Sequence, residues 1–406
     1  MIRIIKEYAD SYNLIYGICD GNDLGLEFYG DVCDIPFFRG EVLDRISPKR
    51  FLDNAGSVLV IGAEIENKPL IPGLENIMAP SASGADYHKR LNSLAEGMAL
   101  AMLERRDFNY KIHVDSGPLM ETAFAMKAGL GFQGMNKGII SEKFGAFFNI
   151  ALIVTDLRIE DIFSAEGETE NAHNGGKNFR EHAKNFSKCA QDCRKCAQNC
   201  PADAFDGEDG FDYRKCITYL KSEMEIEDIF SAEGETENAQ NSGKNFRKHA
   251  KNFSKCAQDC RKCAQNYPSG AFDGEDGFDY RKCISYLTQK KGVLSENEMR
   301  VIGVSIYGCD ICRNVCPYNS RRAQAGEKTG GERELLIRIL NMGKSEFEKT
   351  FENSNFAWRG RTTIRRNCLI ALYNLGGESN LDVITEYLDN SNEILRNTAQ
   401  ILTEMA

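Results

Sequence analysis

The central third of this chain carries closely spaced cysteines, and most of that stretch is written twice. One run reads Cys-x3-Cys-x2-Cys-x3-Cys-Pro from Cys189 to Pro201, and a later run reads Cys-x2-Cys-x3-Cys-Pro from Cys309 to Pro317. The spacing Cys-x2-Cys-x3-Cys-Pro is typical of bacterial ferredoxins, in which a short loop wraps one 4Fe–4S cluster and the cysteine before proline ligates a second cluster. Structural zinc is the alternative, but it favours isolated Cys-x2-Cys pairs with longer gaps. The sequence therefore predicts a two-cluster, ferredoxin-like iron–sulfur domain.

Residues 159–220 and 226–287 form a tandem duplication with an offset of 67 residues, and only seven positions differ between the copies. Solenoid proteins need about three or more diverged repeats, so two nearly identical copies do not indicate a solenoid. We interpret the second copy as a duplicated segment inserted into a domain that requires one copy. Each copy opens with a polar stretch, such as residues 165–171, that is typical of an exposed or disordered loop.

The copies differ at the cysteine before proline, because Tyr267 replaces Cys200 in the second copy. Ligation of each cluster by both motifs requires that cysteine, so the first copy is the better match to a complete domain. The predicted ligands of cluster A are Cys189, Cys193, Cys196 and Cys316. The predicted ligands of cluster B are Cys200, Cys309, Cys312 and Cys283, with Cys216 as the alternative to Cys283. The rival assignment gives cluster A the cysteines Cys256, Cys260 and Cys263, and it leaves cluster B short of a ligand.

Composition and charge restrict where this protein works. No stretch reaches the roughly 18 apolar residues that span a membrane, and the N-terminus lacks the pattern of a signal peptide. We expect a cytoplasmic protein with no membrane partner, and disulfides are rare in that compartment, so clustered cysteines indicate metal. The net charge of −10 argues against a globally basic nucleic-acid binder, although a local basic patch is compatible with it.

Residues 1–157 show the alternation of strands and helices that is typical of an α/β domain. Ser57–Gly62 and Asn149–Val154 are short apolar runs that predict buried strands. Tyr87–Glu104 has apolar residues at helical spacing, and Glu121–Lys127 predicts a second, shorter helix. Residues 326–406 carry helical periodicity throughout, and the short helices predicted there resemble HEAT-type repeats.

A series of motifs runs along the chain in a fixed order. They are Asp86–Lys89, Val114–Pro118, Ala128–Gly134, Phe144–Phe148, Thr155–Leu157, Arg281–Leu287, Ile306–Cys312, Val315–Asn319, Phe356–Arg361, Arg365–Asn367 and Ile370–Leu372. Taken together, these motifs resemble the epoxyqueuosine reductase family of cobalamin-dependent iron–sulfur enzymes. The resemblance covers nearly the whole chain outside the second copy and the polar inserts. It implies a multidomain α+β/α/β fold with a cobalamin-binding and active-site domain at 1–157, a two-cluster domain at 158–325 and a helical module at 326–406.

The resemblance also implies a reaction. Epoxyqueuosine in tRNA loses its epoxide oxygen and becomes queuosine, while electrons from a low-potential donor pass through two 4Fe–4S clusters to cobalamin. Asp115 matches the family's acid position, and we expect burial to raise its pKa toward neutrality so that it can donate a proton. The alternative for Asp115 is a turn residue that caps the next segment, which is common for Asp before Ser-Gly-Pro.

Other residues receive roles from the same resemblance. Tyr87 and His88 are expected to contact the cofactor, although the start of a helix is also an ordinary place for surface or capping residues. The glycines expected to let the backbone approach the corrin are Gly129, Gly131 and Gly134, and an ordinary tight turn is their alternative.

A cluster of basic and aromatic residues near the C-terminus is the predicted tRNA-binding site. Its members are Trp358, Arg359, Arg361, Arg365 and Arg366. Arginine pairs with phosphate in a bidentate manner, and an aromatic face stacks on an unpaired base. The alternative is a solvated helix end with one buried tryptophan.

We expect the protein to be a monomer, and two other functions remain open for it. One is a related corrinoid reductase that acts on a small molecule, and it is supported by Met135, which stands where the family typically has a lysine. The other is a ferredoxin-type electron carrier without substrate chemistry. Bound cobalamin would argue against the carrier, and co-purified tRNA would argue against the small-molecule reductase.

Overall fold

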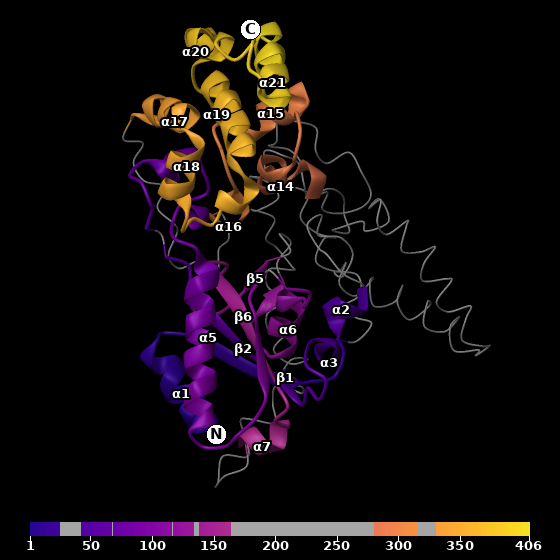
Figure 1. The fold of residues 1–406 in the computed structure, drawn as a ribbon. Helices are drawn as coiled ribbons and strands as arrows, with labels where there is room; N and C mark the ends of the chain where they lie inside the picture. Colours follow the sequence, from indigo (N-terminus) through magenta and orange to yellow (C-terminus); the bar gives the residue numbers. More distant parts are fainter. Residues whose placement is uncertain (25–41, 67, 116, 134–137, 164–279, 315–329) are drawn as a thin grey trace, which may run out of the picture.

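The computed structural model describes residues 1–24, 42–66, 68–115, 117–133, 138–163, 280–314 and 330–406. These residues form a sheet-containing part, which holds the N-terminus, and a helical part, which holds the C-terminus (Figure 1). Within these ranges, no helix is both long enough and apolar enough to cross a membrane.

The N-terminal part is built on a four-stranded sheet. Its spatial order is β1 (Ile15–Asp20), β2 (Ser57–Glu64), β6 (Phe148–Thr155) and β3 (Tyr110–His113), and every neighbouring pair is antiparallel. A separate two-stranded ribbon joins β4 (Phe132–Gln133) to β5 (Ile139–Ile140). The predicted strands at 57–62 and 149–154 are confirmed. Their antiparallel pairing was not predicted from the sequence.

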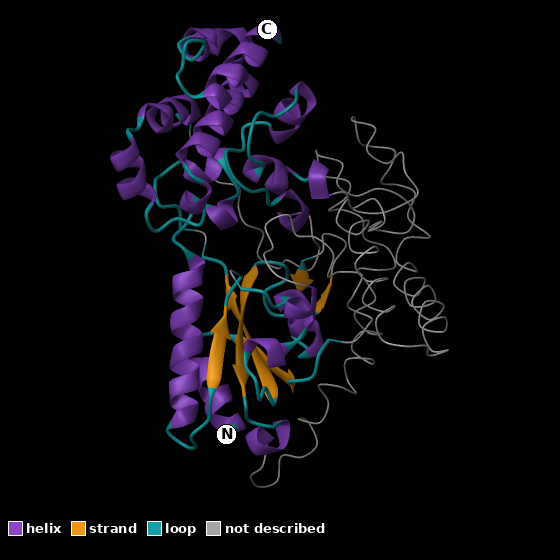
Figure 2. Cartoon of the chain, turned by 45° about the vertical axis from the view of Figure 1, so that its right-hand side comes forward, coloured by secondary structure: helices purple, strands orange, loops and turns teal. Residues whose placement is uncertain are grey.

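Helices cover both faces of this sheet because successive strand residues point to opposite sides. Val58 and Val60 belong to one core with α6 (Glu121–Lys127), whereas Leu59 and Ile61 belong to another core with α5 (Tyr87–Leu103) and α1 (Ile2–Ser11). Figure 2 shows the sheet between these helices. Burial on both faces explains why β2 and β6 are continuous apolar runs rather than alternating ones. The predicted helices at 87–104 and 121–127 are confirmed.

Short helices complete the N-terminal part. They are α2 (Val42–Ile46), α3 (Pro48–Phe51), α4 (Leu74–Ile77), the 3-10 turn η2 (Pro80–Ala82) and α7 (Ile159–Phe163). Of these, α4 leaves the sheet and packs in the core of the helical part, where Leu74 and Ile77 are completely buried. The segment from α4 to α5 therefore joins the two parts.

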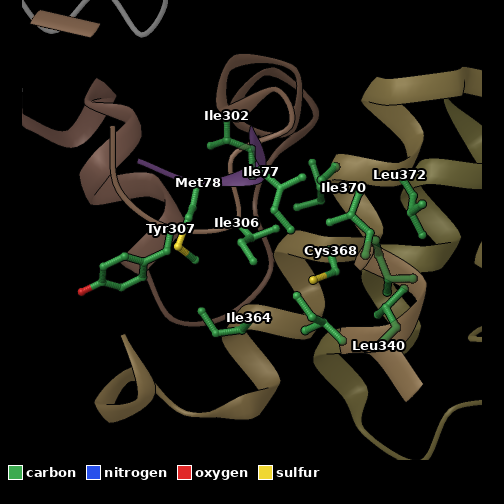
Figure 3. Close-up of a cluster of buried hydrophobic side chains, with 14 of the residues drawn as sticks. Ile77, Met78, Ile302, Ile306, Tyr307, Leu340, Ile364, Cys368, Ile370 and Leu372 are labelled. Atoms are coloured by element: carbon green, nitrogen blue, oxygen red, sulfur yellow. The ribbon is translucent and has the colours of Figure 1, made fainter. Parts of the chain in front are cut away.

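The helical part is a single packed unit around one hydrophobic core. Its elements are η6 (Tyr280–Lys282), α14 (Ile284–Gln289), α15 (Glu296–Ile302), α16 (Ile311–Asn314), α17 (Glu332–Asn341), α18 (Lys344–Phe351), η7 (Ala357–Arg359), α19 (Arg361–Gly376), η8 (Gly377–Asn380), α20 (Leu381–Thr385) and α21 (Glu393–Glu404). Figure 3 shows Ile77, Ile302, Ile306 and Cys368 side by side in this core. Each fully buried Ile or Leu of this kind contributes about 1.5–3 kcal/mol.

The helices predicted in residues 331–406 are confirmed as α17, α19, α20 and α21. Their classification as HEAT-like repeats stays a prediction. The hydrophobic core of these helices extends to α14 and α15, which precede the expected boundary at residue 326. The helices that follow the second copy therefore pack with the C-terminal helices, and the three-domain division stays a prediction.

Candidate functional site

The candidate acid, Asp115, lies just beyond the end of β3 in a left-handed backbone conformation with φ of 49°. Such a conformation is uncommon for a residue with a Cβ atom and costs about 1–3 kcal/mol. The surrounding structure maintains it, because the Asp115 N–H donates to Oε1 of Glu121 on α6. The Asp115 side chain remains 56% exposed, so its carboxylate is accessible to a ligand.

A buried histidine, His113, packs beneath the surface of the loop that carries Asp115 and stabilises it through hydrogen bonds. His113 is almost completely buried, and its Nε2 accepts a hydrogen bond from the Leu119 N–H at 3.0 Å. Its other nitrogen, Nδ1, must then carry the proton and donate to Glu121 Oε1 at 3.1 Å. Burial raises the pKa of the Glu121 carboxyl, and the neighbouring Asp115 charge adds to that shift. Glu121 thus joins the end of β3 to the Asp115 backbone.

The first two residues of α5 face Asp115. The Tyr87 hydroxyl donates to Asp115 Oδ2, and His88 Nε2 lies 3.4 Å from the same oxygen. Asp86 caps the helix, because its Oδ1 accepts from the His88 N–H at 2.9 Å and contacts His88 Nδ1 at 2.7 Å. The Tyr87 and His88 rings stack with their centroids 4.2 Å apart. The structure therefore brings together three residues that the sequence analysis singled out separately.

The charges in this cluster differ from those expected from the sequence. The pKa of His88 is raised to about 9, mainly by the hydrogen bond to Asp115 and also by Asp86, while burial opposes this shift. Burial alone would raise the pKa of Asp115, but hydrogen bonds from His88 and Tyr87 outweigh burial and lower it below its ordinary value. The expectation that burial raises the pKa of Asp115 is therefore wrong for this structure. Asp115 is a carboxylate beside a protonated His88.

Residues 353–355 of the helical part form hydrogen bonds with the start of α5, next to the same cluster. The Tyr87 N–H donates to Asn355 Oδ1 at 3.0 Å, and the Asp86 N–H donates to the Asn353 carbonyl at 2.6 Å. Lys89 Nζ donates to Asn353 Oδ1 at 2.6 Å. These bonds fix the start of α5, and with it Tyr87 and His88, against the helical part.

Next to Asn355 lie two aromatic residues, Tyr307 and Trp358, and the latter is the chain's single tryptophan. The indole N–H donates to the Asn355 carbonyl at 3.1 Å and to the Tyr307 hydroxyl at 3.2 Å, while the side chain remains 57% exposed. The Arg359 guanidinium lies 4.9 Å from the Trp358 ring centroid. Burial raises the pKa of Tyr307 to about 12. Asn355 therefore links the two sites, because its side chain binds the Tyr87 backbone and its carbonyl binds the exposed Trp358 indole, which Arg359 covers.

The other predicted RNA-binding arginines do not share this surface. Arg361 Nη1 donates to the Met342 carbonyl at 2.6 Å, and Arg365 Nη2 donates to the Tyr387 hydroxyl at 3.1 Å. Arg366 is completely buried. The expectation that Arg366 contacts phosphate is wrong, because its guanidinium donates to backbone carbonyls inside the protein.

The described glycines of the predicted cofactor turn have different surroundings. Gly129 has φ of 80° after the end of α6, and a Cβ there would meet no atom of the described residues within 4 Å. A Cβ on Gly131 would lie 2.2 Å from the Ile140 carbonyl oxygen, so this glycine allows β4 and β5 to approach each other. Gly134 and Met135 lie outside the described residues. Gly129 therefore borders open space, whereas Gly131 has a structural function.

Three of the predicted cluster ligands belong to the described residues. Cys283 is the N-cap residue of α14, while Cys309 precedes α16 and Cys312 lies within it, and all three are half-buried. Between the last two lies Asp310, whose carboxylate accepts from the Ser81 N–H at 2.8 Å and from the Ser81 hydroxyl at 2.6 Å. This contact joins the segment Cys309–Cys312, called the cysteine loop below, to η2 of the N-terminal part.

The remaining predicted ligands lie outside the described residues, so their positions stay predictions. They are Cys189, Cys193, Cys196, Cys200, Cys316 and the alternates Cys216, Cys256, Cys260 and Cys263. Within the described ranges, no three His, Cys, Asp or Glu side chains converge as metal ligands. Half-buried thiols on a loop and a short helix fit cluster ligation, but the complete ligand set needs cysteines from these other segments.

Sequence reasoning missed several residues that organise the site. Asn355 gave no signal, because its function depends on a contact across 268 positions. Tyr307 belongs to the Ile306–Cys312 motif, but its bond to Trp358 across 51 positions could not be inferred from the sequence. His113 and Glu121 had a weak signal, since both flank the Val114–Pro118 motif. Asp310 stands inside the cysteine motif, but its partner Ser81 could not be inferred from the sequence.

Comparison with known proteins first defines the class. Residues 255–319 match the model of a 4Fe-4S double cluster binding domain. This interval contains the second copy's cysteines together with Cys283, Cys309, Cys312 and Cys316, and it excludes the first copy. The chain is thus an iron–sulfur protein with an antiparallel α/β part and a helical part.

Relatives and solved structures then narrow the comparison to one group of enzymes. An epoxyqueuosine reductase of Lactococcus garvieae is 26% identical over 361 residues, which covers 86% of this chain and 77% of the relative. The Bacillus subtilis enzyme is 22% identical and covers 89% of this chain and 75% of the relative. The structure of the Streptococcus thermophilus enzyme matches with a TM-score of 0.62 at 22% identity, over 98% of this chain and 88% of that chain. Over most of its length the chain is therefore similar to epoxyqueuosine reductases, which are oxidoreductases, and it shares their fold.

A further structural match carries a nucleic acid. The crystal structure of epoxyqueuosine reductase with an epoxyqueuosine-modified tRNA-Tyr stem loop has a TM-score of 0.66 and 21% identity to this chain, covering 98% of this chain and 88% of that one. At this identity, the match establishes a shared fold.

Proposed function

We propose that this protein reduces epoxyqueuosine in tRNA to queuosine, with electrons from a low-potential donor passing through two 4Fe–4S clusters to a bound cobalamin. The observation that carries the proposal is the cluster of Asp115, Tyr87 and His88 at the junction of the two parts. This cluster has a strained, exposed carboxylate with two hydrogen-bonding partners. Backbone strain of this kind is concentrated at functional sites.

Residues at the junction fit a bulky cofactor. The Asp115 side chain is 56% exposed and faces Tyr87 and His88, so a planar macrocycle bound at this junction would meet these residues. When bound, cobalamin supplies a reduced cobalt that activates the epoxide carbon. The protein's own residues orient the substrate and control the proton that the leaving oxygen needs.

Asp115 is the proposed proton donor to that oxygen. A ligand that displaces water from Asp115 would raise its pKa, because burial disfavours the charged form. His88, protonated at neutral pH with its pKa of about 9, lies 3.4 Å from Asp115 Oδ2 and is the proposed source of that proton. The Bacillus subtilis enzyme has been solved with its aspartate-bearing catalytic loop swung out of the active site, which supports a catalytic aspartate on a loop here.

Trp358 and Arg359 are the proposed tRNA contacts. Their segment also contains Asn355, which binds the backbone of Tyr87. An exposed indole can stack on an unpaired base, and an arginine beside it can pair with a phosphate. In this arrangement, the modified nucleoside would reach Asp115 while the neighbouring nucleotides contact the helical part. We place the protein in the cytoplasm as a monomer.

The deciding experiment measures both the absorption spectrum of bound cobalamin and the conversion of the tRNA substrate. Anaerobically purified protein, supplied with cobalamin and a chemical reductant, should change the cobalamin absorption and convert an epoxyqueuosine-modified stem loop to the queuosine form. An unmodified stem loop of the same sequence is the matched control. Cobalamin binding without conversion would favour the small-molecule reductase, which Met135 supports. Iron–sulfur absorption without cobalamin binding would favour the electron carrier.

A further inference from the structure

We propose that Arg366 and Asn367 of α19 are positioning residues for one iron–sulfur cluster, because they join the two segments that carry Cys283 and Cys309. The inference rests on the iron–sulfur part of the proposed function and is independent of tRNA and cobalamin. It assigns a function to a buried arginine that the substrate site does not use.

Arg366 holds the end of α14. Its Nη1 donates to the carbonyls of Lys290 and Gly292, each at 2.6 Å, and its Nη2 donates to the Leu287 carbonyl at 3.3 Å. The last carbonyls of a helix have no partner within the helix, so a buried helix end needs donors from elsewhere. The guanidinium, which is completely buried, supplies these donors and places a positive charge at the negative end of the helix.

Asn367 joins that helix end to the segment that precedes Cys309. Its Nδ2 donates to the Thr288 carbonyl at 2.7 Å and to the Ile306 carbonyl at 2.8 Å. Its Oδ1 accepts from Arg366 Nη2 at 2.7 Å and from Nε at 3.0 Å. Both oxygen and nitrogen of the amide are therefore used, and the two side chains act as one unit.

A third contact brings this unit to the cysteine loop. The Gly308 N–H donates to Thr288 Oγ1 at 3.0 Å, and Gly308 immediately precedes Cys309. At its other end, α14 begins directly after its N-cap Cys283 and extends only from Ile284 to Gln289. A helix this short transmits a shift of its C-terminal end to Cys283. The side chains of α19 therefore set the separation between Cys283 and Cys309.

General stabilisation does not require a charge here. Burying an arginine is costly, and a well-packed apolar residue at such a site is often neutral or stabilising. The observed bonds instead fix three backbone segments relative to one another with defined geometry. Hydrogen bonds and geometry around a cluster tune its reduction potential.

The test compares substitutions with a matched control on the same helix. Asn367→Leu keeps the branching and the number of heavy atoms and removes the amide, while Thr288→Val removes the hydroxyl that accepts from Gly308 without changing the shape. Arg365→Lys is the control, since Arg365 points to Tyr387 instead. Iron content, and the midpoint potential and EPR signal of each cluster, are measured on anaerobic full-length protein.

We expect Thr288→Val to shift the midpoint potential of one cluster and leave the other unchanged, and Thr288→Ser to restore the parent value. Asn367→Leu should lose one EPR signal and reduce iron from about eight to about four per chain. Arg365→Lys should match the parent. If Asn367→Leu fails to fold, the pair Thr288→Val and Thr288→Ser decides.

Parent-like potentials in Thr288→Val, or equal shifts of both clusters, would overturn the inference. A parent protein without iron would instead refute the iron–sulfur part of the proposed function. A parent with two clusters but no activity on tRNA would leave the inference intact.

Discussion

A Cβ atom on Gly117 would lie 2.4 Å from Cδ2 of His113, whose ring is buried beneath the Asp115 loop. Real Cβ atoms do not approach this closely, so Gly117→Ala must displace His113 and its bond to Glu121. Overpacking of this kind typically costs about 1–3 kcal/mol. We expect Gly117→Ala to lower the free energy of unfolding by this amount, measured by urea denaturation, and to lower activity.

Gly343→Ala is the matched control for that substitution. Gly343 has φ of −62°, and a Cβ there would meet no atom of the described residues within 4 Å. Its activity should equal that of the parent, and its stability should fall only by the small cost of replacing glycine with alanine at the N-cap of α18. Equal stabilities for Gly117→Ala and the parent would show that His113 can move aside without effect on the loop.

Asp115→Asn should lower the rate of epoxide reduction by roughly two to four orders of magnitude, because the amide cannot donate the proton. Asparagine tolerates the left-handed conformation, so the backbone at φ of 49° should be preserved. Iron content and cobalamin binding should not change. Asp382→Asn, at a carboxylate that is 67% exposed, is the control. Retained activity in Asp115→Asn would remove this residue from the mechanism.

His88 makes stability depend on pH. Its pKa in the folded protein, about 9, exceeds the ordinary value of 6.5, so the protonated ring stabilises the folded state. This contribution is complete below pH 6.5, decreases as the pH rises, and is lost above about 9. The difference in free energy of unfolding between the parent and His88→Gln should therefore shrink between these two pH values. A difference that stays constant across this range would show that His88 is neutral in the folded protein.

Trp358→Ala should weaken binding of a tRNA stem loop by about 1–3 kcal/mol, with little change in salt dependence, because stacking is not a phosphate contact. Arg359→Ala should lower the slope of log affinity against log salt by about one. Titration at several salt concentrations measures both effects. Lys349→Ala, at an exposed lysine of α18, is the control. Parent-like binding by both variants would show that this surface does not contact RNA, and the small-molecule reductase would become the leading alternative.

The two copies of the cysteine segment can be separated by single substitutions. Tyr267 removes one ligand from the second copy, so Cys196→Ala should lose a cluster and Cys263→Ala should not. The family model instead begins at residue 255, so it matches the cysteine-containing part of the second copy, which adjoins the downstream motif. Iron content of the two variants decides, and loss only in Cys263→Ala would assign ligation to the second copy.

Strong local patterns were sufficient to predict the elements that carry the site. The apolar run at 57–62 and the helical spacing at 87–104 correspond to β2 and α5, because a strand buried on both faces and a helix against a sheet each need a characteristic sequence period. The cysteine spacing was equally local, since two or three of the predicted ligands of each cluster lie within a few residues of one another. The family match to a 4Fe-4S domain agrees with it.

Only the tertiary structure determines which charged side chains are buried and hydrogen-bonded within the protein and which are exposed to solvent. Arg365 and Arg366 are neighbours in the sequence, yet one reaches Tyr387 and the other is buried against residues 287–292. The direction of the Asp115 pKa shift depends on His88, which is distant in sequence and close in space. A residue's own sequence neighbourhood specifies its secondary structure. Its exposure and charge state depend on the segments that pack against it in the folded protein, and those segments are distant in the sequence.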